Sequence, residues 1–200
     1  RLRLEKAAEL MQSDPAAAAD RLAAAEAEAD RLGNIIEGLL MLSRTEASAV
    51  PVETVDIAAV VRSRVEHWKP LADESEVMLD YDGPESALGL AVPTAVEQIV
   101  DNFLDNALSV SPEHSVLIVR VFVDRNGVLL SVLDEGPGMT ADECTRAFDR
   151  FWRASSATPG SGLGLSIVAQ LANASGARAE LRPRAPRGLE ARVLFSPPRP

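Results

Sequence analysis

The chain has 200 residues, of which 46% are hydrophobic and 25% are charged, and this composition is typical of a globular protein. The formal net charge of −10 argues against a nucleic-acid-binding protein, because phosphate backbones demand clustered Lys and Arg. Cys144 is the only cysteine, which excludes an internal disulfide, and no apolar run approaches the roughly 20 residues of a membrane span. Any polyanionic ligand must therefore be bound by backbone N–H groups, a metal ion or a few placed arginines.

The first 50 residues predict helices. Residues 1–12 have the pattern of the end of a helix, and from about residue 20 to residue 47 the apolar residues follow a heptad spacing. So narrow an apolar stripe favours an antiparallel helical hairpin that pairs with a second copy, although an ordinary intramolecular helix also fits. Because the chain starts at Arg1 within a helical pattern, we expect it to be a piece of a longer protein.

A change of pattern at Pro51 predicts a domain boundary, with a helical hairpin remnant at 1–50 and a second domain at 51–200. In the second domain, strand and helix patterns mix without strict alternation, which predicts an α/β (α+β) two-layer sandwich whose one mixed sheet is covered by helices on one face. Strands are expected at 52–57, 77–81, 87–91, 116–123, 128–133, 179–182 and 191–195, and helices at 58–71, 93–110, 141–148 and 162–175. The first of these helices should end near Pro70, and Asn126-Gly127 is a strong hairpin signal.

Polar side chains recur on one side of the helix expected at 93–110. Gln98, Asn102 and Asn106 are spaced by four and Ser109 follows by three, so they share one helix face opposite the apolar one. Amide oxygens are suitable ligands for Mg²⁺ that is also bound to phosphate. A solvated polar face is the alternative interpretation of this spacing.

Three further segments carry chemistry. Asp134 ends a strand, where its carboxylate can accept a hydrogen bond from an exocyclic amine, and Gly136 and Gly138 allow the backbone to approach a ligand, unless they only form a turn. The glycine-rich segment 160–165 precedes a helix and can expose N–H groups to an anion. The aromatic residues of 148–153 either close the core or anchor a mobile cover, or lid, that residues 154–160 would form.

The order of these segments resembles the ATP-binding domain of sensor histidine kinases, in the wider GHKL family that includes type II topoisomerases, mismatch-repair ATPases and certain chaperones. Asn102 and Asn106 match its N box, Asp134–Gly138 its first glycine box, Phe148–Arg153 its F box and Gly160–Leu165 its second glycine box. The helix ending at Leu39-Leu40-Met41-Leu42-Ser43-Arg44 resembles the second helix of the kinase dimerisation domain. The resemblance implies the Bergerat-type ATP-binding fold.

The resemblance also implies roles for particular residues. Asn106 would coordinate Mg²⁺, Asn102 would contact phosphate, and Asp134 would bind the adenine amino group. The other nucleotide-binding positions would shape the base pocket (Gly136, Gly138), anchor the lid (Phe148, Phe151) or belong to the phosphate-binding segment (Gly160, Ser161, Gly162, Leu163, Gly164).

Asn102 distinguishes the subfamilies. Relatives that hydrolyse ATP carry a Glu four residues before the Mg²⁺-binding Asn, as the general base for water. Because an amide stands there in this chain, the resemblance favours transfer of the γ-phosphoryl group to a side chain. The alternatives are another ATPase or serine kinase of the same superfamily, and a pseudokinase-like binding or dimerisation module.

Two departures from the family pattern bear on activity. No acceptor histidine is found, because His67 and His114 both lie outside an acceptor context, so this chain should bind ATP without phosphorylating itself. Ser109 and Val110 replace a basic residue and an aromatic or His residue, and Arg150 or Arg153 would compensate for the lost cation. We also expect a homodimer partner and a cognate response regulator for the full-length protein, as the cytoplasmic portion of a membrane sensor attached through upstream segments.

Overall fold

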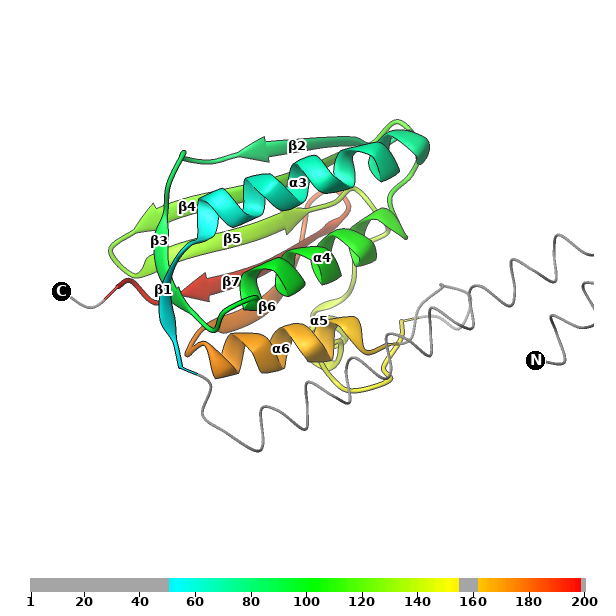
Figure 1. Ribbon diagram of the computed structural model, residues 1–200. Coiled ribbons are helices and arrows are strands. Elements are labelled where there is room, and N and C mark those ends of the chain that lie inside the picture. The colour runs from blue at the N-terminus through cyan, green and yellow to red at the C-terminus, as the bar shows by residue number, and fades with distance from the viewer. Residues whose placement is uncertain (1–50, 155–161, 199–200) are drawn as a thin grey trace, which may run out of the picture. The chain divides into compact units, whose positions relative to one another are not determined.

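The computed structural model describes residues 51–154 and 162–198 (Figure 1). The helical hairpin expected at 1–50 lies outside these residues, so that domain and its boundary at Pro51 stay predictions. The described elements are β1 (Glu53–Asp56), α3 (Ile57–Glu74), β2 (Met78–Asp82), β3 (Leu88–Ala91), α4 (Ala95–Leu108), β4 (Val116–Asp124), β5 (Gly127–Leu133), α5 (Ala141–Arg146), α6 (Gly164–Ala174), β6 (Arg178–Pro183) and β7 (Leu189–Phe195).

Five strands form a mixed sheet in the order β2-β4-β5-β7-β6. The β2–β4 pair is parallel and the remaining pairs are antiparallel. The β4–β5 hairpin turns at Asn126-Gly127, as its sequence predicts, because Gly127 adopts a φ of 134° that a side chain disfavours. The mixed sheet is therefore confirmed.

The expectation of a single sheet is wrong, because β1 and β3 form a separate two-stranded antiparallel sheet. The sequence shows that both segments are extended but carries no signal for their partner. Leu90 of β3 donates a backbone hydrogen bond to Ser196, just beyond β7. This single bond to the residue after β7 lies outside any strand ladder, so the small sheet stays separate from the large one.

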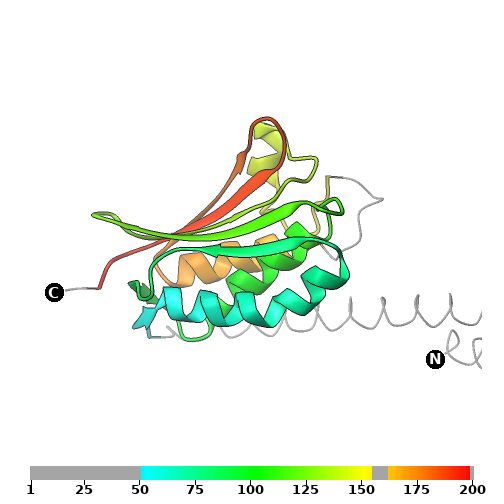
Figure 2. The same ribbon diagram turned by 90° about the horizontal axis from the view of Figure 1, so that it is seen from above.

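Helices α3, α4 and α6 cover one face of the five-stranded sheet, which confirms the expected two-layer arrangement (Figure 2). Alternate residues of the strands point into this layer, and Leu117, Val119 and Val121 of β4 are buried there. On the helical side, Ile99, Phe103 and Leu104 of α4 are almost fully buried. Burial of this apolar side leaves the opposite face of α4 for polar residues.

Helix α3 continues four residues past Pro70, so the expected end near that proline is wrong. The proline removes one helical hydrogen bond, but Ala72 is fully buried, and its carbonyl is bonded by the N–H groups of both Ser75 and Val77. Two side-chain hydrogen bonds also hold α3 against α4, because Asp101 Oδ1 accepts from Arg64 Nε at 2.7 Å and from Trp68 Nε1 at 2.9 Å. Tertiary packing therefore outweighs the local effect of the proline.

Within the described ranges, none of the helices combines the length and the apolar character needed to cross a membrane.

Candidate functional site

The polar face of α4 lies against the start of α6. A Cβ placed on Gly164, the first residue of α6, would stand 2.8 Å from Asn102 Oδ1 and 3.3 Å from Asn106 Nδ2. A side chain at position 164 would therefore have to displace the end of the Asn102 side chain, so the two helices meet closely at this glycine. The structure thus brings the two asparagines and Gly164 of the glycine-rich segment together, although about sixty residues separate them in the chain.

The amide nitrogens on this face are bound within α4 itself. Asn102 Nδ2 donates to the Gln98 carbonyl at 2.8 Å, and Asn106 Nδ2 donates to the Asn102 carbonyl at 2.7 Å. Ser109 Oγ donates to the Asn106 carbonyl at 2.8 Å. Because these bonds engage the amide donors, the side-chain oxygens of Asn102 and Asn106 are left as acceptors or cation ligands.

Asp134 is a buried carboxylate at the end of β5, with 5% of its surface exposed. Its Oδ1 accepts from the N–H of Gly136 at 2.9 Å and of Leu189 at 3.1 Å. Burial is the largest influence on its pKa and raises it above the ordinary value, against these hydrogen bonds and the positive charge of Arg184. Within the described ranges no group donates to Oδ2, so that oxygen is available to a ligand.

A backbone hydrogen bond joins the residues on either side of the expected lid. The N–H of Phe151 donates to the carbonyl of Gly162 at 2.9 Å. Gly162 has a φ of 70°, and a Cβ there would lie 2.9 Å from the Phe151 Cα. The Phe151 side chain is 66% exposed, so its backbone makes this link and its ring is not part of the core.

The remaining expected residues of these two segments differ in their surroundings. Phe148 is half-buried, whereas Arg150 and Arg153 are exposed. Leu163 is buried and precedes α6 without a side-chain cap, which suits the first-turn N–H groups of α6 to an anion. Gly160 and Ser161 lie outside the described residues.

The loop between β6 and β7 contacts the turn formed by Asp134–Gly138, here called the first glycine turn. The sequence did not predict this contact. Arg184 Nη1 donates to the Asp134 carbonyl at 2.5 Å. A Cβ on Gly188 would stand 2.1 Å from the same carbonyl oxygen, and a Cβ on Gly138 would stand 2.8 Å from the Gly188 carbonyl oxygen. The one local signal is the glycine that ends the Pro-Arg-Gly stretch, and it does not indicate which segment it faces.

Gly136 has a different neighbour from Gly138. A Cβ on Gly136 would stand 3.0 Å from both Cγ2 and the carbonyl oxygen of Val110, just beyond α4. The first glycine turn is therefore packed between the end of α4 and the β6–β7 loop.

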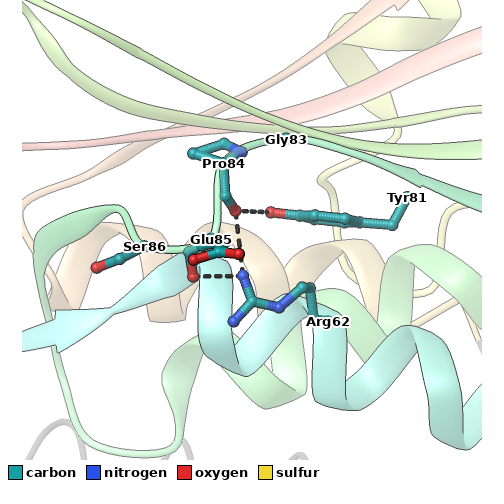
Figure 3. Close-up of a pocket in the computed structure, with 6 residues that line it drawn as sticks. All are labelled: Arg62, Tyr81, Gly83, Pro84, Glu85 and Ser86. Carbon is teal, nitrogen blue, oxygen red and sulfur yellow. Dashed lines mark hydrogen bonds between the residues drawn. The ribbon is translucent and has the colours of Figure 1, made fainter.

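A hollow of about 490 Å³ lies elsewhere, beside the turn that follows β2 (Figure 3). Its polar side chains are engaged with the turn itself, since Arg62 donates to the carbonyls of Pro84 and Glu85 and the Tyr81 hydroxyl donates to Pro84 at 2.8 Å. The strand β2 runs antiparallel to β5, so β2 runs toward the start of β5, and Asp134 lies beyond the other end of β5. The side chains around this hollow accordingly stabilise the turn after β2, and the hollow is separate from the candidate site.

Residues 91–200, more than half of the chain, match the sequence model of the histidine kinase-, DNA gyrase B- and HSP90-like ATPases. The chain belongs to this family. Within the family its sequence and fold are similar to those of the ATP-binding catalytic domain of named two-component sensor histidine kinases.

The sensor protein SphS of Synechococcus elongatus is 31% identical over 195 residues, which cover 91% of this chain and 46% of that protein. The sensor-like histidine kinase SenX3 of Mycobacterium tuberculosis is 32% identical over 151 residues, covering 72% of this chain and 37% of that protein. The chain thus spans less than half the length of these relatives.

Solved structures agree with this assignment. The mycobacterial sensor histidine kinase MprB superimposes with a TM-score of 0.64 at 28% identity, over 74% of this chain and all of that one. Full-length ShkA in complex with AMPPNP gives a TM-score of 0.73 at 26% identity, over 98% of this chain and 43% of that one.

Proposed function

We propose that this chain binds ATP with Mg²⁺ between α4, the first glycine turn and the start of α6, and transfers the γ-phosphoryl group to a histidine of the dimerisation domain. The observation that carries the proposal is the contact of Gly164 with Asn102 and Asn106. The amide oxygen of Asn102 and the amide group of Asn106 lie beside the first turn of α6, and phosphate with its metal ion needs both amide oxygens and helix N–H groups.

The α4 amides fit a magnesium ion by their chemistry, since no donor in the part of the chain that the structure describes binds their side-chain oxygens. Asn106 would hold the ion and Asn102 would contact phosphate. Bound there, the ion supplies positive charge to the phosphate oxygens. The segment from Gly160 to Gly164, with Ser161 and Leu163, would bind phosphate through its N–H groups.

The base would lie against the first glycine turn. Oδ2 of Asp134 is the acceptor suited to an adenine amino group, and Gly136 and Gly138 would shape the pocket around it. Phe148 and Phe151 would anchor the lid. Ser109 binds a helix carbonyl and carries no charge, so Arg150 and Arg153 are the cations proposed to meet the phosphates.

Transfer to a side chain is favoured over hydrolysis because an amide, Asn102, stands four residues before Asn106, where relatives that hydrolyse ATP carry a Glu as the general base. The carboxylate of Asp101 is already engaged by Arg64 and Trp68 of α3. The chain's residues would therefore orient the phosphoryl group for in-line transfer without activating water.

In the full-length protein, the phosphohistidine would then pass its phosphoryl group to an aspartate of a response regulator. The helices expected in 1–50 would pair with a second copy. The catalytic part would be cytoplasmic, and upstream segments would attach the protein to the membrane.

The first test is titration with a non-hydrolysable ATP analogue, with and without Mg²⁺, by calorimetry. Asn106→Ala should weaken Mg²⁺-dependent binding by about tenfold or more, because it removes the proposed ligand oxygen. Asn173→Ala is the matched control, since Asn173 is exposed at the other end of α6.

Because Ser109 stands where the family carries a basic residue, the pseudokinase-like module is a second candidate. Such a module would bind a partner without phosphoryl transfer. Failure to bind the analogue in either condition would favour that alternative. Binding without transfer of labelled phosphate in the full-length protein would contradict the kinase proposal alone. ATP turnover by this chain that is lost in Asn106→Ala would instead indicate an ATPase.

A further inference from the structure

Arg184 of the β6–β7 loop, residues 184–188, and Leu189 at the start of β7 together bind both backbone polar groups of Asp134. The N–H of Asp134 donates to the Leu189 carbonyl at 3.1 Å, and its own carbonyl accepts from Arg184 Nη1 at 2.5 Å. The Leu189 N–H donates to the side-chain Oδ1 at 3.1 Å. Together with the Gly136 N–H, these contacts fix the residue and leave Oδ2 as the open acceptor.

The loop is itself held in shape. The Arg184 N–H donates to the Gly188 carbonyl at 3.0 Å, which closes the loop on itself. Gly188 has a φ of 100°, and a Cβ there would overlap the Asp134 carbonyl oxygen at 2.1 Å. The backbone of the loop therefore packs directly on the residue that ends β5, which no side chain at position 188 would permit.

Arg184 differs from its neighbours on the hairpin. Its side chain is half-buried against the end of β5, whereas Arg182 and Arg187 are exposed. Arg184 and Arg187 both line a hollow of about 340 Å³ beside the loop. Within the described ranges Arg187 donates no hydrogen bond, so it provides a matched control of the same residue type.

We infer that Arg184 is a positioning residue for base recognition, which holds Asp134 through its backbone carbonyl so that Oδ2 faces the 6-amino group of a purine. This inference rests on the proposed nucleotide function. It makes the β6–β7 hairpin a determinant of the preference for 6-amino over 6-oxo purines. Loss of the Arg184 contact releases the Asp134 carbonyl, so the backbone that carries the carboxylate can shift, and the penalty falls on the base that needs an acceptor at Oδ2.

The test compares an ATP analogue with its inosine counterpart, which carries a 6-oxo group, by calorimetry in the presence of Mg²⁺. Arg184→Ala should weaken binding of the ATP analogue by about tenfold while inosine-analogue binding changes by less than about twofold. Arg187→Ala should leave both affinities unchanged. Arg184→Lys, which keeps a charged donor, should restore part of the preference and covers the case in which the alanine variant does not fold.

Equal losses for the two bases in Arg184→Ala would show a structural role only and overturn the inference. The same follows if Arg184→Lys and Arg184→Ala both keep the unsubstituted chain's ratio of affinities. If the unsubstituted chain binds neither analogue, the proposed function fails and takes this inference with it. Binding without any preference for the 6-amino base would overturn the inference and the assignment of Asp134 to the adenine amino group, while nucleotide binding between α4 and α6 would still stand.

Discussion

At the scale of the residue, Asp134 shows how a single carboxyl group is prepared for one contact. Two N–H groups engage Oδ1, and burial holds the pKa of the group above its ordinary value of 3.8. An ionised carboxylate with one open oxygen is a good acceptor for an amine, and its protonated form is a poor one. The residue should therefore make both ligand binding and stability depend on pH.

Asp134→Asn tests this role. The variant should bind the ATP analogue at least about tenfold more weakly, because its amide nitrogen would oppose the amine with a second donor. The affinity of the unsubstituted chain should fall as the pH drops through the raised pKa of Asp134, and that dependence should be absent in the variant. Calorimetry between about pH 4 and pH 7 measures both.

The sign for stability is opposite to that for binding. Since the folded carboxyl has the higher pKa, the folded state binds more protons than the unfolded state between 3.8 and that pKa. The free energy of unfolding should accordingly decrease as the pH rises through this window. Urea unfolding that shows the same pH slope for Asp134→Asn would contradict the assignment to this residue.

At the scale of the element, the start of α6 combines several functions within a few residues. Gly164 packs on the α4 amides, and Gly162 bonds to Phe151 across the base of the expected lid. Within the described ranges no side chain caps the helix, so its first turn is suited to an outside acceptor. The helix end, the lid base and the amide face are consequently one structural unit.

Gly162→Ala should disturb this unit, and Gly176→Ala should not. The two glycines have similar φ angles, 70° and 64°, but a Cβ at 162 would lie 2.9 Å from Phe151, whereas nothing lies within 4 Å of one at 176. Both variants should lose about 1 kcal/mol of stability from the left-handed backbone. Only Gly162→Ala should also bind the ATP analogue about fivefold or more weakly, because the clash displaces the lid base. Equal affinities in the two variants would sink the proposed role.

Element prediction succeeded where the pattern is local. The Asn126-Gly127 turn and the β-branched runs on either side of it predicted the β4–β5 hairpin, and the apolar side of the helix expected at 93–110 predicted α4. It failed at Pro70, where the burial of Ala72 extends the helix, and at β1 and β3, whose partners depend on distant residues. These failures concern energies that arise only after packing.

At the scale of the whole molecule, the net charge of −10 is a source of repulsion within the folded chain. Exposed ion pairs such as Lys69–Glu66 oppose it only weakly, because they lie in water. Screening by salt reduces the repulsion more than it weakens these pairs. The protein should therefore be more stable at moderate ionic strength than at low ionic strength.

Raising NaCl from about 10 mM to about 150 mM shortens the screening length from about 30 Å to about 8 Å. The unfolding temperature measured by scanning calorimetry should then rise by about 2 °C. Tetramethylammonium chloride at the same ionic strength is the control for specific sodium binding. An unfolding temperature that falls with salt would show that the ion pairs dominate.

The sequence by itself determined the family, the two-layer class of fold and the residue types of the site, because four short motifs in fixed order and the hydrophobic periods are properties of neighbouring residues. Tertiary structure decided which motifs meet: Gly164 with the α4 amides, Phe151 with Gly162, and Arg184 and Leu189 with Asp134. These last partners lie 50 and 55 residues apart in the chain. No local propensity specifies such contacts, because they arise only when the buried faces of the sheet and helices are packed together.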